Sequence, residues 1–313
     1  MGWNDRNERI AVFEDTMNMC NQNRFLKDSI RRSIASQRLI YEDDDIAGVF
    51  GEQDNDCSSS FSNHREPMHV YNSDADIIVS KKRSFEAARA YSKTQKVCVL
   101  NFASATSPGG GVKKGSSAQE ECLCRCSTLY PCISDVIVKK GFHDRHRTML
   151  SAGKLSALYN DDCIYTPGVS VFKTDSSTPQ AVPDKEWYTV DVISCAAPNL
   201  WLKPSNYLNP ASGTEAIKIG NSDLKALHLK RASRIFDIAK ENGVETMILG
   251  VFGCGAFQNP PEVVAAGICE VVKQHRRDFR TIEFAVFCPP GHTANYDAFR
   301  KVFGKAKNDE DVE

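Results

Sequence analysis

The stretch that decides the fold is VCVLNFASATSPGGGVKKGSSAQEECLCRCSTLY, residues 97–130. Its first six residues, Val97–Phe102, are mostly apolar and predict a short buried strand. Three consecutive glycines follow, and the run from Glu120 to Tyr130 has the composition of a helix. A buried strand, a glycine-rich loop and a helix in this order indicate an α/β protein.

The same alternation of apolar runs and helical patterns continues on both sides of this stretch. We expect strands at 69–71, 77–79, 163–172, 188–195, 246–252 and 282–287, and helices at 85–91, 223–241 and 262–275. Strands that are apolar on both faces and alternate with helices predict a mainly parallel or mixed sheet covered on both sides. Ligands bind such sheets at the carboxyl ends of the strands, so the segments after Phe102 and Phe252 are the candidate binding loops.

The two ends of the chain have a different composition from this middle part. Residues 10–40 have apolar positions at three- and four-residue steps and predict a helix, whereas 42–62 is acidic, rich in Ser and Asp, and expected to be a mobile surface loop. We therefore divide the chain into an N-terminal helical extension with that acidic loop (1–68), packed on an α/β domain (69–304), and an acidic tail (305–313).

Composition excludes several classes of function. With 39 basic and 40 acidic side chains, the net charge is −1, which argues against an electrostatic grip on nucleic acid or an anionic membrane. The chain has no run of about 18 apolar residues that could span a membrane, and its first ten residues do not resemble a secretion signal. Several of the twelve cysteines lie in apolar runs, which is typical of buried thiols in a reducing, intracellular compartment.

A second glycine-containing segment, Gly253 to Pro261, follows the apolar run MILGVF. A turn that delivers free N–H groups to the start of a helix attracts phosphate, because the unpaired donors and the helix dipole both favour an anion. An ordinary strand-to-helix turn is the alternative, since Pro260 or Pro261 also suits a first helical position.

Two adjacent carboxylates, Glu120 and Glu121, open the helix after the triple glycine. Ser117 to Glu120 fits the S-x-x-E capping box, so Glu120 could simply bond back to the helix start. The alternative interpretation is chemical: cleavage of a glycosidic bond needs a carboxyl group that protonates the leaving oxygen and activates water.

Three other clusters have simpler interpretations. The cysteines at 122, 124 and 126 have no second ligand pair at zinc-site spacing, which favours helix packing over a metal site. His143 to His146 is interpreted as a solvated turn. We interpret Lys81–Arg83 as a solvated turn as well, since it is too short for a nuclear address.

Gly109–Gly111, a spacer of seven residues and Gln119–Glu121 together resemble the GGG-x6-8-QEE signature of the poly(ADP-ribose) glycohydrolases. The chain is most similar to the microbial-type members, whose catalytic domain has the macrodomain fold. The similarity extends over residues 9–303. It includes the blocks 9–16, 99–105, 119–130, 165–169, 196–199 and 250–259, whereas 42–62 and 176–179 resemble added loops.

This resemblance implies a macrodomain-like mixed sheet flanked by helices, ADP-ribose as the recognised unit, and hydrolysis of the ribose–ribose O-glycosidic bond. Glu121 matches the general acid of the family, and Glu120 matches the neighbouring acid that fixes the ribose hydroxyls. Gln119 would hold this turn in place. No metal or redox cofactor is implied.

The same resemblance implies a binding role for two loops. The distal ribose and diphosphate would be held by Asn101 and the triple glycine Gly109, Gly110 and Gly111. The second loop would hold the diphosphate and consists of Gly253, Cys254, Gly255, Ala256 and Phe257, with Phe257 packing against the ribose.

Two other functions use the same pocket. A mono-ADP-ribosyl hydrolase would cleave the unit from a protein side chain or nucleic acid, and an ADP-ribose reader would bind without turnover; the intact acid pair argues against the reader. The expected partners are poly(ADP-ribose), ADP-ribose as product and ADP-ribosylated proteins, with no membrane and no sequence-specific nucleic acid. We expect a monomer located in the cytoplasm, the nucleus or both.

Overall fold

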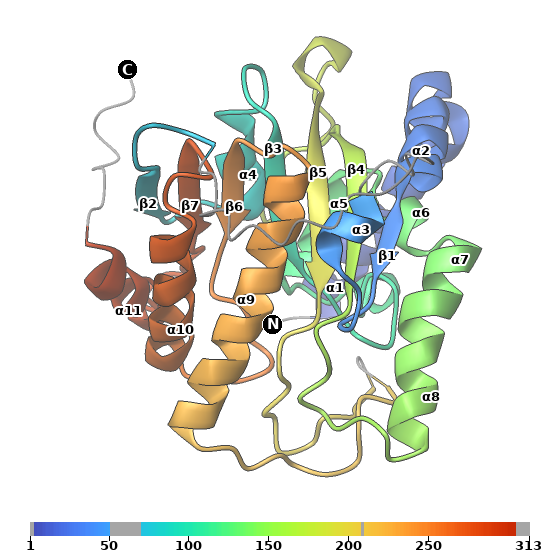
Figure 1. Cartoon of the computed structure of the whole chain (residues 1–313). Helices are drawn as coiled ribbons and strands as arrows, with labels where there is room; N and C mark the ends of the chain where they lie inside the picture. Colours follow the sequence, from blue (N-terminus) through green and yellow to red (C-terminus); the bar gives the residue numbers. More distant parts are fainter. Residues whose placement is uncertain (1–2, 51–69, 208–209, 305–313) are drawn as a thin grey trace, which may run out of the picture.

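The computed structural model describes residues 3–50, 70–207 and 210–304, with side chains from residue 5 onward. A seven-stranded mixed sheet, in the order β1-β4-β5-β3-β6-β7-β2, forms its centre (Figure 1). Its strands are β1 (Arg38–Ile40), β2 (Asp76–Ser80), β3 (Val97–Phe102), β4 (Cys163–Val171), β5 (Tyr188–Cys195), β6 (Thr246–Leu249) and β7 (Thr281–Ala285).

Five neighbouring strands, β5, β3, β6, β7 and β2, run parallel. At one edge, β4 pairs antiparallel with β5, and β1 pairs antiparallel with β4. The expected mixed α/β sheet is therefore confirmed. The N-terminal segment contributes to this sheet directly, because β1 pairs with β4. Since parallel strands end at the same edge, the segments that follow β3, β5 and β6 meet there.

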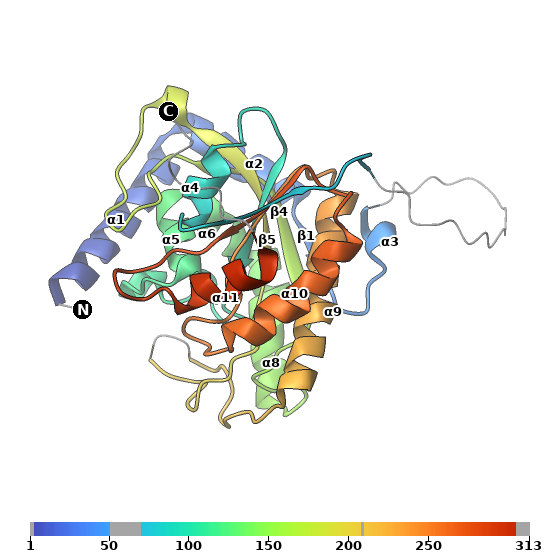
Figure 2. The same cartoon turned by 90° about the vertical axis from the view of Figure 1, so that its left-hand side faces the viewer.

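Helices cover both faces of the sheet and make three layers (Figures 1 and 2). On one side are α9 (Asn221–Glu241), α10 (Pro261–Gln274) and α11 (Ala294–Phe303); on the other are α1 (Trp3–Gln22), α4 (Ser84–Arg89), α5 (Gln119–Cys126) and α6 (Leu129–Ile133). The remaining helices are α2 (Arg24–Ser36), α3 (Ile46–Phe50), α7 (Val136–Val138) and α8 (Arg145–Ser151), with the short turns η1 (Val112–Lys114), η2 (Lys139–Asp144) and η3 (Asp184–Glu186).

Alternate residues of β3 show how this sequence supports three layers. Cys98 and Leu100 are buried in the cluster formed with α9, α10 and α11, whereas Val97 and Val99 are buried with α1, α4 and α5. Successive side chains of a strand point to opposite faces, so an apolar residue at nearly every position of β3 is what a sheet covered on both sides requires.

The single helix expected over residues 10–40 is wrong. The chain forms α1 and α2, which are separated by Asn23, and then β1. Asn23 has an extended backbone, and its side-chain oxygen accepts the Leu26 N–H at 3.2 Å, so it ends one helix and caps the next. Within the expected acidic loop at 42–62, residues 46–50 form α3, and 51–62 lie outside the described residues.

The helix expected from Glu120 to Tyr130 is also interrupted. Ser127 is extended (φ −149°, ψ 178°) and makes an isolated bridge to Val171, so α5 ends at Cys126 and α6 begins at Leu129. Similarly, β6 ends at Leu249 and not at Phe252: Gly250 and Val251 do not pair as a strand, and a turn begins at Phe252. The expected strand at 69–71 does not form at Val70 and Tyr71, and residue 69 lies outside the described part.

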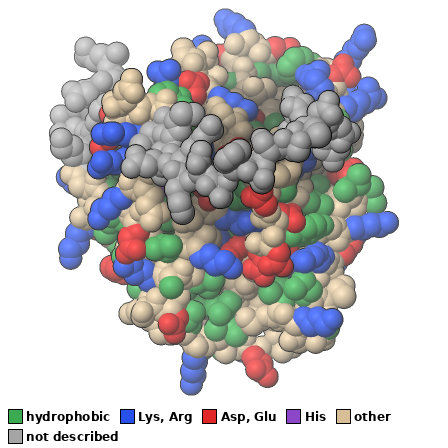
Figure 3. All heavy atoms as spheres, viewed as in Figure 1, with side chains coloured by type: hydrophobic (Ala, Val, Ile, Leu, Met, Phe, Trp, Pro, Cys, Tyr) green, Lys and Arg blue, Asp and Glu red, His purple; other side chains and the backbone are tan. Residues whose placement is uncertain are grey.

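The outer surface agrees with the balanced composition. On the face shown in Figure 3, basic and acidic side chains are interspersed. None of the helices in the described ranges is long and apolar enough to cross a membrane.

Candidate active site

Asn101, near the end of β3, is the first polar group of the site. Asn101 is fully buried and lies opposite Ser194 of β5 in the strand register. Its Nδ2 donates to Ser194 Oγ at 2.9 Å and to Glu120 Oε1 at 3.3 Å. Its Oδ1 has no partner among the described residues. A buried acceptor without a donor is costly, so this oxygen is suited to receive a hydroxyl of a ligand.

Gln119 fixes the start of α5 against the edge of β3. The pairing of β3 with β6 ends at Val99, and beyond it the Gln119 side chain satisfies the β3 backbone. Gln119 Oε1 accepts the Phe102 N–H at 2.9 Å, and Nε2 donates to Leu100 O at 2.8 Å and to Ser84 Oγ at 3.1 Å. The helix therefore begins at a fixed position relative to Asn101.

The capping box considered for Ser117 and Glu120 does not form. The N-cap of α5 is Ala118, and it has no side-chain capping bond. The Glu120 carboxylate turns into the protein instead, where Oε2 accepts the Ser104 N–H at 2.8 Å. Burial, and next the Glu121 carboxylate, raise the pKa of Glu120 to about 8, although the N–H groups of Ser104, Asn101 and Gly109 oppose the shift.

Glu121 is 7% exposed, and its two oxygens have different surroundings. Oε1 accepts the Gly111 N–H at 2.8 Å, whereas Oε2 has no partner among the described residues. Burial raises the pKa of Glu121, and the Gly111 N–H and the Arg125 guanidinium partly oppose this. One oxygen of this carboxyl is thus held in place, and the hydrogen-bonding capacity of the other is unused among the described residues.

The triple glycine is shaped around the two carboxylates. Gly109 and Gly110 have φ values of +66° and +55°, which favour glycine. A Cβ at Gly110 would lie 2.6 Å from Glu121 Oε1 and 3.2 Å from Glu120 Oε2, and one at Gly109 would lie 2.7 Å from the Tyr130 ring. A side chain at Gly110 would displace the two carboxylates, and one at Gly109 would displace the Tyr130 ring.

The second turn, Gly253 to Phe257, connects β6 with α10. The N–H groups of Gly255, Ala256 and Phe257 donate to no acceptor among the described residues, so they can bind an anion. The start of α10 offers fewer unpaired N–H groups to an anion than the sequence predicts. Pro260 and Pro261 have no N–H, and Val263 donates to Pro260 O, so among the described first-turn groups of α10 the N–H of Glu262 remains.

Asn259 holds this turn in shape. It is 2% exposed, and its Nδ2 donates to Gly253 O at 3.0 Å and to Pro198 O at 2.7 Å. Its Oδ1 lies 2.9 Å from Nε2 of the buried His228. Sequence reasoning did not single out Asn259, Ser104 or Ser194, because no motif marks the contacts that they make in the folded chain.

The two candidate loops meet at the end of β5. Ala105, in the loop after β3, is buried with Tyr159 and Ala196, and Phe257 of the second turn packs on this cluster. The Phe257 and Tyr159 rings are 6.2 Å apart between centroids. The acid pair, the triple glycine and the 253–257 turn therefore belong to one edge of the sheet.

The solvated turn expected at residues 143–146 is wrong. These residues span the end of η2 and the start of α8, and His143 and His146 are both 1% exposed. Burial lowers the pKa of His143 to about 3.

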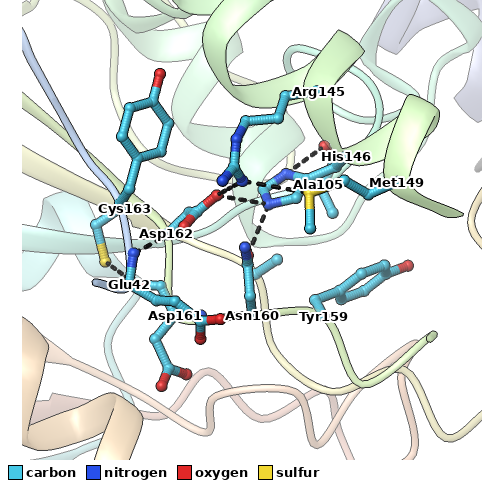
Figure 4. A network of polar contacts seen from close by, with 12 residues as sticks. Glu42, Ala105, Arg145, His146, Met149, Tyr159, Asn160, Asp161, Asp162 and Cys163 are labelled. Atoms are coloured by element: carbon cyan, nitrogen blue, oxygen red, sulfur yellow. Dashed lines mark hydrogen bonds and ion pairs between the residues drawn. The ribbon is translucent and has the colours of Figure 1, made fainter. Parts of the chain in front are cut away.

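His146 lies in the network of Figure 4, with Nε2 2.7 Å from Asn160 Oδ1 and 3.2 Å from Asp162 Oδ2. Its Nδ1 lies 3.2 Å from Ala105 O. Arg145 donates to the same Asp162 carboxylate at 2.7 Å. The network ties α8 and the 160–162 segment to the loop after β3.

The cysteines of α5 pack within the protein. Cys124 and Cys126 are buried in the core between the sheet and the helices α1, α4, α5 and α6. The Cys122 thiol lies 3.3 Å from the Arg125 guanidinium. Among the described residues, no group of three or more His, Cys, Asp or Glu side chains is placed to hold a metal ion.

A buried carboxyl with one unpartnered oxygen, at the same edge of the sheet as a turn of N–H groups that can hold an anion, is the arrangement expected of a hydrolase for a phosphate-containing substrate on a macrodomain-like fold. The family model "Microbial-type PARG, catalytic domain" matches residues 8–174. The chain belongs to this family and is a poly(ADP-ribose) glycohydrolase. No curated protein matches the chain in sequence.

Solved structures of poly(ADP-ribose) glycohydrolases are similar in fold to this chain over most of its length. The poly(ADP-ribose) glycohydrolase of Thermomonospora curvata is 25% identical, with 95% of this chain and 99% of that chain covered and a TM-score of 0.73. The enzyme of Deinococcus radiodurans in complex with ADP-ribose is 25% identical, with 88% and 97% covered and a TM-score of 0.68. The Thermomonospora curvata enzyme with the inhibitor ADP-HPD is 24% identical, with 94% and 99% covered and a TM-score of 0.72, and supports the fold.

Proposed function

We propose that Glu121 is the general acid and base with which this chain hydrolyses the ribose–ribose O-glycosidic bonds of poly(ADP-ribose) and releases ADP-ribose. The observation that carries the proposal is the buried Glu121 Oε2, which has no partner among the described residues, while Oε1 is held by the Gly111 N–H. Because burial raises the pKa of Glu121, its carboxyl group retains a proton above the usual range of a glutamate.

Glu120 is suited to a binding role. Both of its oxygens accept bonds from the protein, Oε1 from Asn101 and Oε2 from Ser104, which fixes the carboxyl in one orientation. Together with the unpartnered Oδ1 of Asn101, it presents acceptors for the ribose hydroxyls. The N–H groups of Gly255, Ala256 and Phe257 would hold the diphosphate, with the triple glycine closing the other side of the ribose.

The reaction then needs a single proton-transferring group. Glu121 donates its proton to the oxygen of the departing ribose as the bond from that oxygen to the anomeric carbon breaks. The anomeric carbon acquires oxocarbenium character, and water attacks it. Glu121, now a carboxylate, accepts a proton from that water, which restores the enzyme and leaves ADP-ribose with a free anomeric hydroxyl.

The setting of this activity is also part of the proposal. We place the enzyme inside the cell, in the cytoplasm, the nucleus or both, acting as a monomer on polymers attached to ADP-ribosylated proteins. The eleven described cysteines are all free thiols, which fits a reducing compartment.

Glu121→Gln tests the assignment, because it keeps the size and the Gly111 bond of this side chain and removes its proton. Turnover of poly(ADP-ribose) should fall by about 10²–10⁴-fold, the usual contribution of general acid–base catalysis. Affinity for ADP-ribose, measured by calorimetry, should remain within a few-fold. Glu14→Gln, an exposed position on α1, is the control for the change of charge. Near-normal turnover in Glu121→Gln would show that another group transfers the proton.

A further inference from the structure

A cavity of about 510 Å³ lies against the outer side of the triple glycine. The residues that line it include Gly110 and Gly111, the two lysines of η1, Tyr130 and Lys139. This volume lies within the usual range for a nucleotide-sized ligand, about 300–1,000 Å³.

The cavity shares two residues with the catalytic centre. Gly110 packs against the Glu121 carboxylate, and the Gly111 N–H donates to it. None of the residues that line the cavity comes from the 253–257 turn. A polymer that is cut at Glu121 extends from the anomeric carbon in two directions: the released unit towards the 253–257 turn, and the leaving unit away from it. The cavity lies where the leaving unit would be.

Two of the three lysines that line the cavity have no carboxylate partner among the described residues. Neither Lys113 nor Lys114 forms an ion pair with a described carboxylate. Lys113 Nζ lies 5.4 Å from the Tyr130 ring centroid, and Lys114 Nζ donates to Tyr207 O and lies 4.0 Å from the Tyr207 ring centroid. Lys139 is different, because its Nζ lies 2.9 Å from Asp144.

The lysine turn is also held in place by α1. Gly115, which ends η1 with φ +70°, packs so closely on α1 that a Cβ would lie 2.5 Å from Arg6 O. Arg9 Nε donates to Gly115 O at 2.7 Å. The backbone that carries Lys113 and Lys114 is therefore fixed relative to the triple glycine, and ordering it on binding costs little entropy.

We propose that this cavity is the subsite for the leaving unit of the polymer, and that Lys113 and Lys114 bind the diphosphate of that unit. The inference rests on the proposed function, because it takes Glu121 as the point of cleavage. Each ADP-ribose unit carries a diphosphate, and two ammonium groups without carboxylate partners are a suitable counter-charge for it. The enzyme thus recognises charge on both sides of the bond that it cuts.

The double variant Lys113→Gln/Lys114→Gln tests this with two substrates. One is a dimer of ADP-ribose, whose leaving unit carries a diphosphate; the other is an aryl ADP-ribose, whose leaving group is an uncharged phenol. kcat/KM for the dimer should fall by about tenfold, as expected for two partly exposed ion pairs. kcat/KM for the aryl compound should stay unchanged. In the variant, kcat/KM for the dimer should also fall less steeply with salt, because fewer ionic contacts remain for salt to screen.

The control is Lys27→Gln/Lys93→Gln, which makes the same charge change at exposed positions on α2 and after α4. It should match the wild type on both substrates. An equal loss on both substrates in the Lys113/Lys114 variant would place the lysines in the site of the released unit, and no loss on either would leave the cavity without this role. A second, lysine-dependent site for free ADP-ribose in calorimetry would assign the cavity to product instead. If Glu121→Gln were active, the proposed function would fail first, whatever these lysines do.

Discussion

At the scale of single residues, the site concentrates two carboxyl groups in a buried position, and this has a cost in stability. Glu120 has a pKa of about 8 in the folded protein, against 4.5 for an ordinary glutamate. Between these two values the folded state holds a proton that the unfolded chain has released. The contribution of Glu120 to stability therefore falls as pH rises through this window, by about 1.4 kcal/mol per pH unit, and is constant above it.

Glu120→Gln should remove this dependence, because glutamine has no proton to release. The stability of the variant relative to the wild type should increase by a few kcal/mol from pH 5 to pH 8. Urea unfolding at pH 5, 6.5 and 8 measures the difference. A difference that stays constant over this range would mean that Glu120 is already ionised in the folded protein.

The residue pattern of the site was accessible from sequence, but its geometry was not. The spacing of the triple glycine and Gln119–Glu121 identified the family. The S-x-x-E pattern at Ser117 fitted a helix cap, and the residues alone left a catalytic pair as the alternative. The direction of the Glu120 side chain depends on the backbone at Ala118 and on Ser104. The Ser104 N–H, 16 residues before Glu120, donates to Glu120 Oε2.

At the scale of elements, the contact between α5 and β3 positions the acid pair. Gln119 makes this contact with three side-chain bonds, two of them to backbone groups of β3 beyond its pairing with β6. Because Glu120 and Glu121 follow Gln119 directly, any shift of the helix start moves both carboxylates.

Gln119→Ala should therefore affect stability and catalysis together. It leaves the Phe102 N–H and Leu100 O without partners, which costs about 1–3 kcal/mol for each buried group. A small displacement of the carboxylates should lower kcat by about tenfold or more. Gln119→Glu keeps the acceptor for Phe102 and loses the donor to Leu100, so it should be intermediate. Urea unfolding and steady-state kinetics measure both quantities; lost stability with unchanged kcat would reduce Gln119 to a structural residue.

Elements were predictable where apolar residues recurred through the whole segment, as in β3, β5 and α9. The pattern failed at breaks made by single residues. Asn23 divides α1 from α2 by capping, and Ser127 divides α5 from α6 by bridging to a strand more than 40 residues away. The sequence analysis expected N–H groups at the start of α10 to bind an anion. Pro260 and Pro261 have no N–H, so the sequence already indicated that these donors must come from the turn before the helix.

At the scale of the whole molecule, segments that are far apart in the sequence meet at the carboxyl ends of the parallel strands. From the N-terminal side, α1 holds the turn that carries Lys113 and Lys114. The loop after β3 and the 253–257 turn meet over Ala196. Such a site exists in the folded state and not in the unfolded chain, so ligand binding and folding are linked.

ADP-ribose should therefore raise the melting temperature. At about 100 times its Kd, a ligand that binds only the folded state stabilises it by about 2.7 kcal/mol. For a chain of this length, about 2–4 °C or less per kcal/mol gives a shift of several degrees. Adenosine should produce a much smaller shift, because it has no diphosphate for the free N–H groups of Gly255, Ala256 and Phe257 to bind. Thermal melts with each compound at millimolar concentration measure this. Equal shifts from both, or none from either, would show that the 253–257 turn does not hold the diphosphate.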